Sequence, residues 1–180
     1  LAGAWQLETV DRGVDEVEAA LANAQEEMLR VPGGASFAPV PDFIPNVGQY
    51  SSLAFDASGH PHISYQDIAN ADLKYAVQTA EGWATETVDT RGDVGEYSSL
   101  ALDPVGGVHI SYYSLQEHTL KYASAAPQGW TVETVDATDD VGACSSLKVD
   151  GQGTPHISYL SASLETLKYA TQLDGVWMYV

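Results

Sequence analysis

Apolar and polar residues alternate along most of the chain from residue 46 onward, in short runs that are separated by turn residues. One set of runs reads Ser-Ser-Leu-Ala-Leu-Asp (98–103), His-Ile-Ser-Tyr (109–112), Leu-Lys-Tyr-Ala (120–123) and Trp-Thr-Val-Glu-Thr-Val-Asp (130–136). Alternation over a few residues is typical of half-buried β-strands, and Asp and Gly between the first two runs are typical of hairpin turns. The pattern therefore predicts a meander of four short antiparallel strands.

The same four runs occur three times at a fixed period. The landmarks are spaced by 47 residues, as in His62, His109 and His156 or Trp83, Trp130 and Trp177. A period of this size indicates one structural unit stacked on copies of itself, and four-stranded meanders at this period are β-propeller blades. The predicted fold class is all-β, with blades over about 46–92, 93–139 and 140–180.

The blade pattern Ser-Ser-Leu-Ala-Leu-Asp-x-x-Gly-x-x-His-Ile-Ser-Tyr resembles the blades of bacterial sialidase-like, BNR-type propellers. The resemblance covers about residues 46–180. It departs from the strict Asp-box, because the Asp and Gly turn leads to His rather than to Thr-Trp. The resemblance implies a secreted or cell-surface bacterial protein, and it implies no particular activity.

The residues before the repeats divide into two segments. Residues 1–12 contain Trp-Gln-Leu-Glu-Thr-Val-Asp (5–11), which matches the last run of each blade and predicts the final strand of a preceding blade. Residues 13–45 do not follow the repeat. Their first half carries apolar residues at helical spacing, and Pro39, Pro41 and Pro45 follow. This segment is predicted to be an α-helical insertion and a Pro-rich connector.

Three blades are fewer than propellers usually need to close, and an open arc exposes apolar faces at both ends. Three outcomes stay open: a ring completed by a second copy, part of a longer propeller, or an open stack. We expect self-association through the open blade edges or the helix. The residues assigned to assembly are apolar or strand-forming residues near the two ends: Trp5, Leu7, Thr9, Val14, Val17, Leu21, Met28, Trp177 and Tyr179.

Charge and composition narrow the set of partners. The net charge is −18, so nucleic acid and anionic membrane surfaces are poor partners. No apolar run approaches the length of a membrane-spanning helix. Cys144 is the only cysteine, which excludes an internal disulfide. An extracellular or cell-surface location fits these properties.

The candidate ligand-binding residues lie in two places. Asn46, Asp93 and Asp140 precede the first strand of each blade, and Trp83 and Trp130 are aromatic rings on which a sugar could stack. Acidic loops of this kind can hold calcium, although none matches Asp-x-Asp-x-Asp-Gly, and no other cofactor or metal is expected. The once-per-blade His and Tyr residues are predicted to be structural: His62, His109, His156, Tyr65, Tyr112 and Tyr159.

The predicted function is a non-catalytic module that binds protein or glycan and self-assembles. No catalytic motif is present. One alternative is a portion of a glycan-active enzyme, either a sialidase-like hydrolase or a lyase. Arg12, Arg30 and Arg91 are the only arginines for the substrate-binding cluster that a sialidase needs. A second alternative is the structural subunit of a filament or ring, built when the N-terminal strand completes a neighbour's last blade.

Overall fold

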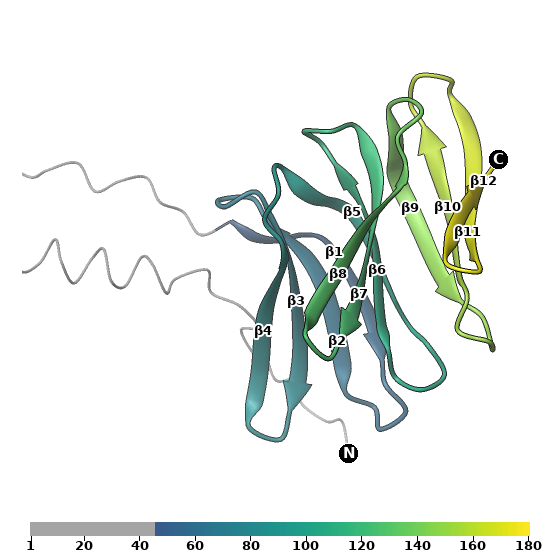
Figure 1. Ribbon diagram of the computed structural model, residues 1–180. Coiled ribbons are helices and arrows are strands. Elements are labelled where there is room, and N and C mark those ends of the chain that lie inside the picture. Colours follow the sequence, from purple (N-terminus) through teal and green to yellow (C-terminus); the bar gives the residue numbers. More distant parts are fainter. Residues whose placement is uncertain (1–45) are drawn as a thin grey trace, which may run out of the picture.

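The computed structural model describes residues 46–180, which form three separate four-stranded antiparallel sheets (Figure 1). In each sheet the strands lie side by side in sequence order, which confirms the predicted meanders. Blade 1 contains β1 (Val47–Phe55), β2 (Pro61–Asp67), β3 (Asp72–Thr79) and β4 (Gly82–Asp89). Blade 2 contains β5 (Val94–Leu102), β6 (Val108–Ser114), β7 (Thr119–Ala126) and β8 (Gly129–Asp136). Blade 3 contains β9 (Val141–Val149), β10 (Pro155–Ser161), β11 (Thr166–Leu173) and β12 (Val176–Tyr179).

The predicted N-terminal strand and the predicted helical insertion lie outside the described residues, and both stay predictions. Seven of the residues assigned to assembly belong to these segments: Trp5, Leu7, Thr9, Val14, Val17, Leu21 and Met28. Within residues 46–180 there is no helix that is long and apolar enough to cross a membrane.

The blades pack face to face through their first strands. β5 contacts β1 and β2 of blade 1, and β9 contacts β5 and β6 of blade 2. Each junction buries one apolar cluster, because the alternating residues of neighbouring sheets meet there. The first cluster joins Leu73, Tyr75 and Val88 of blade 1 to Val94, Leu100, Val108, Ile110, Tyr112 and Ala123 of blade 2. The second joins Ala101, Leu120, Tyr122 and Val135 of blade 2 to Val141, Leu147, Ile157, Tyr159 and Ala170 of blade 3.

Serine side chains tie the first strands together in the same way at both junctions. The hydroxyl of Ser98 donates to the carbonyl oxygen of Tyr50 at 2.7 Å, and that of Ser145 donates to the carbonyl oxygen of Tyr97 at 3.0 Å. The backbone N–H groups of Leu100 and Leu147 donate to the hydroxyls of Ser52 and Ser99, each at 3.0 Å. The Ser-Ser pair of the repeat is thus an inter-blade contact, which explains why a polar pair stands inside an apolar strand.

A β-bulge interrupts the first strand of each blade. Tyr50, Tyr97 and Cys144 stand there with φ of 51°, 51° and 53°, in the left-handed region. The pairing of β1 with β2 and of β5 with β6 shifts register on either side of this residue. The strand continues to pair on the N-terminal side of the bulge, where Val94 lies opposite Ser114. β5 therefore begins at Val94, four residues before the Ser-Ser pair at which the alternation begins.

Candidate functional site

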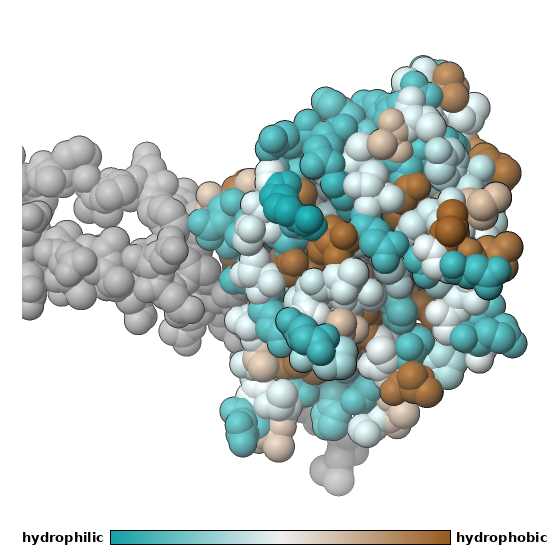
Figure 2. Space-filling view, in the orientation of Figure 1, coloured by the Kyte–Doolittle hydropathy of each residue, from teal (hydrophilic) through white to brown (hydrophobic). Residues whose placement is uncertain are grey.

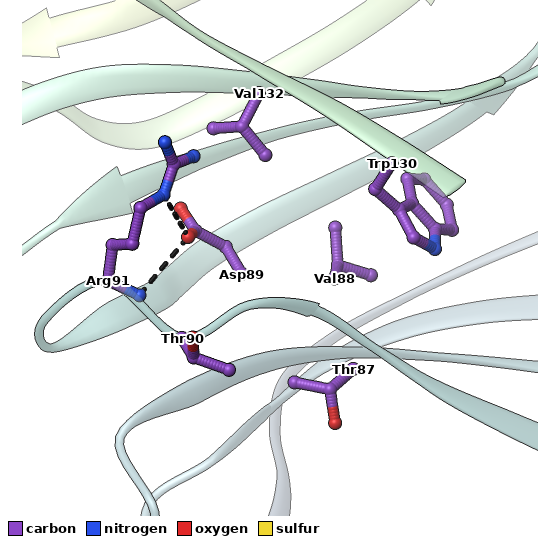
Figure 3. Close-up of a pocket in the computed structure, with 7 residues that line it drawn as sticks. All are labelled: Thr87, Val88, Asp89, Thr90, Arg91, Trp130 and Val132. Carbon is purple, nitrogen blue, oxygen red and sulfur yellow. Dashed lines mark hydrogen bonds and ion pairs between the residues drawn. The ribbon is translucent and has the colours of Figure 1, made fainter. Parts of the chain in front are cut away.

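A groove of about 350 Å³ lies between the outer strands of blades 1 and 2 (Figure 3). Its size falls within the range of small-molecule sites. One wall is the end of β4 and the loop after it, and the other wall is β8, which belongs to the next blade. The lining residues are Thr87, Val88, Asp89, Thr90, Arg91, Trp130 and Val132.

Trp130 forms one end of the groove, and its orientation is fixed by blade 1. Its ring meets Tyr75 edge to face, with 5.3 Å between ring centroids, and its indole N–H donates to Oε2 of Glu86 at 2.9 Å. Both partners come from blade 1, although Trp130 is at the start of β8. A ring that is held by packing and by a hydrogen bond is a preformed surface for a ligand.

Arg91 lies at the other end of the groove, with Val88 and Val132 between it and Trp130 (Figure 3). Its Nε donates to Oδ1 of Asp89 at 2.8 Å, and its backbone N–H donates to the same oxygen at 3.1 Å. The side chain is 64% exposed. The terminal NH₂ groups make no hydrogen bond to any described residue, so the guanidinium presents open donors at the groove.

Asp89 holds Arg91 in place from a buried position. Its Oδ2 accepts a hydrogen bond from the Tyr112 hydroxyl at 2.7 Å, so both carboxylate oxygens are engaged. Burial, together with the neighbouring Asp89, raises the pKa of Tyr112, which therefore stays protonated as a donor. The hydrogen bond to Asp89 raises the pKa of Arg91. The pair therefore keeps its geometry across the neutral pH range.

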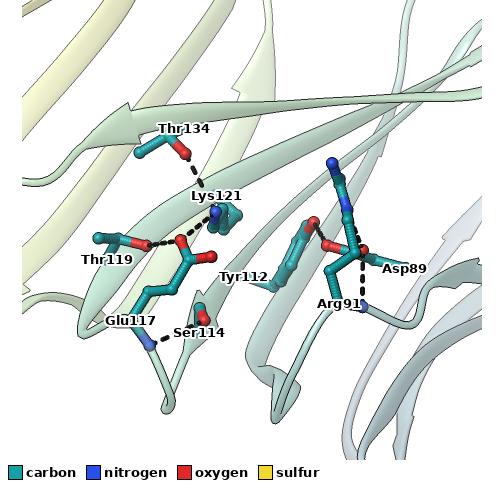
Figure 4. A network of polar contacts seen from close by, with 8 residues as sticks. All are labelled: Asp89, Arg91, Tyr112, Ser114, Glu117, Thr119, Lys121 and Thr134. Carbon is teal, nitrogen blue, oxygen red and sulfur yellow. Dashed lines mark hydrogen bonds and ion pairs between the residues drawn. The ribbon is translucent and has the colours of Figure 1, made fainter.

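At the next junction, the buried carboxylate equivalent to Asp89 is that of Asp136, and it pairs with Lys168. Lys121 occupies the repeat position of Lys168, but it has other partners (Figure 4). Lys121 stands on β7 and forms an ion pair with Glu117, and its Nζ donates to the Thr134 hydroxyl at 3.0 Å. These partners keep Lys121 within its own blade, and the Asp89 carboxylate takes the Arg91 side chain instead.

The corresponding residues between blades 2 and 3 are arranged differently. There Asp136 accepts a hydrogen bond from Lys168 Nζ at 2.6 Å, and from the Tyr159 hydroxyl at 2.7 Å. Thr138 occupies the repeat position of Arg91, and Lys168 also donates to its hydroxyl at 3.1 Å. The Lys168 amine lies 5.0 Å from the centre of the Tyr179 ring. The Lys168 side chain is 13% exposed, whereas that of Arg91 is 64% exposed.

The predicted loop residues Asp93 and Asp140 do not line the groove, although Asp93 lies in the same loop as Arg91, two residues further on. Asp93 accepts a hydrogen bond from the Gln66 amide at 3.1 Å, and Asp140 accepts one from the Tyr113 hydroxyl at 2.7 Å. Both precede the first strand of a blade, β5 or β9, whereas Trp130 is on β8, the last strand of blade 2. Asn46 is exposed at the start of β1, and Trp83 begins β4 without lining the groove.

Of the predicted ligand-binding residues, Trp130 alone lines the groove. Sequence reasoning missed Arg91 and Asp89. One signal was present in the sequence, because Arg91 departs from the repeat where blade 2 has Thr138.

The repeated histidines make contacts within their own blades. Nδ1 of His62 lies 2.5 Å from the Tyr75 hydroxyl, and Nδ1 of His156 lies 2.6 Å from that of Tyr169. His109 bonds Tyr122 in the same way. Burial lowers the pKa of His62, which favours its neutral form. Among the described residues, no cluster of three or more His, Cys, Asp or Glu side chains could hold a metal ion.

Two further predicted residues take part in contacts inside the chain. The Trp177 ring meets Tyr122 edge to face at 4.9 Å, and its indole N–H donates to Glu133 at 2.8 Å. These contacts repeat those of Trp130 one blade later. Tyr179 is partly exposed beside Lys168.

No protein family and no curated protein matches this sequence. Solved structures match at the level of the fold. A fucose lectin from Kordia zhangzhouensis in complex with methyl-fucoside has a TM-score of 0.51 at 16% identity, over 72% of this chain and 96% of that chain. A mutant Aleuria aurantia lectin in complex with Fucα1-6GlcNAc has a TM-score of 0.55 at 16% identity, over 83% of this chain and 48% of that chain.

An α-L-arabinofuranosidase from Fusarium graminearum, with an iminosugar inhibitor, has a TM-score of 0.51 at 15% identity, over 74% of this chain and 48% of that chain. The fold is that of a β-propeller. The predicted all-β propeller blades are thereby confirmed. The match spans nearly the whole Kordia lectin chain and about half of each of the other two chains.

Proposed function

We propose that this propeller arc is a glycan-binding module, and that the groove between β4 and β8 holds the sugar. The observation that carries the proposal is the placing of a fixed aromatic ring, Trp130, across the groove from the open guanidinium of Arg91. The apolar C–H face of a pyranose packs on an aromatic ring, and its hydroxyl oxygens accept hydrogen bonds from a guanidinium. The fucose lectins with the same fold support this assignment.

The ligand class that fits best is a neutral sugar. The chain carries a net charge of −18, which repels sialylated, sulfated and uronic glycans. Methyl-fucoside, the ligand of the Kordia lectin structure, is therefore a suitable first probe. An extracellular or cell-surface setting fits a module of this kind, and the sialidase-like repeat resemblance agrees with that setting as a prediction.

Binding is favoured over hydrolysis because the carboxylates at the groove already have partners. A glycosidase places two carboxyl groups on either side of the scissile bond, usually with one able to donate a proton. Asp89 is buried and engaged by Arg91 and Tyr112, and Glu86 accepts the indole N–H of Trp130. Both carboxylates therefore have partners inside the protein.

Replacing Arg91 by Thr is expected to weaken the binding of a neutral sugar about tenfold or more. Loss of the charge-assisted donors removes roughly 1.5 kcal/mol or more of binding free energy. A difference of about 1.4 kcal/mol corresponds to a tenfold change in the dissociation constant. Thr keeps the backbone of this loop, because Thr138 occupies the same repeat position and its backbone N–H bonds Asp136 at 2.9 Å. Since buried Asp89 loses its cation in this variant, circular dichroism must show that the variant is folded under the conditions of the titration. Isothermal titration calorimetry with a panel of neutral saccharides that includes methyl-fucoside measures the change.

The matched control is Lys148→Ala, which removes one positive charge on β9, where the other blades have Ala54 and Ala101. This variant should bind like the wild type. Unchanged affinity in the Arg91→Thr protein would contradict the assignment of the groove. Turnover of an aryl fucoside or arabinofuranoside by the wild-type protein would favour the enzyme alternative instead.

A further inference from the structure

The two ends of the arc expose residues that are buried at the internal junctions. Leu73 and Leu120 are 0% exposed because the next blade covers them, whereas Leu167 at the same repeat position in blade 3 is 80% exposed. At the other end, Leu53 of β1 is 55% exposed. Its equivalents, Leu100 and Leu147, are 4% and 1% exposed, because each packs on the preceding blade.

Among the described residues, blade 3 has more exposed large apolar side chains than blade 1. In Figure 2, hydrophobic residues appear along the side of the molecule that blade 3 forms. They come mainly from β11, β12 and the loop before β11: Leu164, Leu167, Tyr169, Leu173, Val176, Met178 and Val180. Monomeric proteins seldom leave an apolar surface of this kind uncovered.

The polar groups of the two ends are complementary as well. At the internal junctions, the second blade supplies a serine hydroxyl and a leucine N–H, and the first blade supplies a carbonyl oxygen and a serine hydroxyl. At the ends, the same repeat positions are Ser51 and Leu53 in β1, and Cys144 and Ser146 in β9. In the described part of the chain, the side chains of Ser51 and Ser146 have no hydrogen-bond partner. Each end therefore carries half of a junction that the chain forms twice internally.

We propose that the blade 3 end of one copy binds the blade 1 end of a second copy, head to tail, with the packing of the two internal junctions. Leu167 of one copy then lies against Gly48 of the other, as Leu73 lies against Gly95 and Leu120 against Gly142, and blade 3 of the first copy covers Leu53 of the second. The hydroxyl of Ser51 donates to the carbonyl oxygen of Cys144, and the N–H of Leu53 donates to the hydroxyl of Ser146. The partner is a second copy because Leu167, Tyr169 and Leu53 are exposed at repeat positions that a neighbouring blade covers inside the chain.

Length also favours a second copy of this chain. The arc matches 48% of the Aleuria lectin chain, so two arcs supply the length of a propeller of that size. The net charge of −18 on each copy opposes the association. Salt should therefore strengthen it, because the Debye length falls from about 30 Å at 0.01 M to about 8 Å at 0.15 M ionic strength.

Light scattering across a concentration series tests the proposal with the chain as it exists. The wild type is expected to reach twice its 19.2 kDa mass, or to grow further if the arcs do not close, at 0.15 M salt. Leu167→Glu and Leu53→Glu should each return the protein to the mass of one chain. Val105→Glu is the control, since Val105 is fully solvent-facing in the turn between β5 and β6, and it should associate like the wild type.

Mixing the two variants tests the head-to-tail geometry itself. The Leu53→Glu protein keeps an intact blade 3 end, and the Leu167→Glu protein keeps an intact blade 1 end, so the mixture should form a two-chain species through one good junction. A symmetric contact between like ends would not be restored by mixing. A wild type that stays monomeric at every concentration, or a mixture that does not associate, would overturn the proposal.

Discussion

The Lys168→Met protein is expected to lose about 3 kcal/mol of folding free energy at pH 7, and the loss should narrow as the pH falls through the pKa of Asp136. Lys168 is the one cation that bonds the buried carboxylate of Asp136 among the described residues, at 2.6 Å. Removal of this partner leaves a buried negative charge with hydrogen bonds only from neutral groups. Urea unfolding at several pH values measures the difference.

The direction of the pH effect follows from Asp136. Burial acts to raise the pKa of this carboxyl group, but the hydrogen bonds from Lys168, Thr138 and Tyr159 outweigh it and hold the pKa below its usual 3.8. A carboxyl group with a lowered folded-state pKa stabilises the fold above its unfolded-state pKa. That contribution is lost as the pH falls through the folded-state pKa. At low pH the carboxyl is protonated in both proteins, so the difference between them narrows.

Lys121→Met is the matched control, because Lys121 occupies the same repeat position in blade 2. Its acidic partner, Glu117, is partly exposed to solvent, so the ion pair is worth less than about 1 kcal/mol. Equal losses in the two variants would show that buried Asp136 does not depend on Lys168. A loss in Lys168→Met that does not change with pH would lead to the same conclusion.

Gly142→Ala is expected to lower the free energy of unfolding by about 4 kcal/mol, because the added methyl group forces blade 3 away from blade 2. A Cβ at Gly142 would lie 2.8 Å from the Cα of Leu120, which is buried on β7, and the backbone has φ +112°. Backbone strain at positive φ costs about 1–3 kcal/mol, and the overpacked contact costs a further 1–3 kcal/mol or so. Urea unfolding followed by tryptophan fluorescence measures the loss.

Gly129→Ala separates the two causes. Gly129 has nearly the same φ, +115°, but a Cβ there has no neighbour within 4 Å. This variant should lose only the strain contribution, at most about half of the loss in Gly142→Ala. Similar losses in both proteins would mean that the approach of β9 to Leu120 tolerates a methyl group.

The repeat made most of the fold predictable, because residues at the same repeat position make the same contacts in successive blades. The alternation of Leu73 and Tyr75 correctly predicts an inward face of the third strand. The bulge at Tyr97 was not predictable in this way. A bulge sets two residues opposite one, which breaks the alternation without ending the strand, so sequence reasoning placed the start of β5 too late.

The candidate site was less predictable, since it depends on the choice of partner across a junction. Trp130 was predicted as a sugar platform from its residue type; it lines the groove, and its contact with a sugar stays a prediction. The role of Arg91 depends on Lys121 turning toward Glu117, and local pattern does not show this choice. Asp93 and Asp140 were predicted from their acidic loops, and the structure pairs both with residues of the preceding blade.

The most direct measurement is an NMR titration that follows the indole N–H signals of the wild-type chain as neutral saccharides, including methyl-fucoside, are added to about 10 mM. That concentration reveals a dissociation constant near 1 mM, or about −4 kcal/mol. We predict that the Trp130 signal, assigned with Trp130→Phe, shifts most, while that of its repeat equivalent Trp177 stays in place. A larger shift at Trp177, or no shift with any saccharide, would contradict glycan binding in this groove.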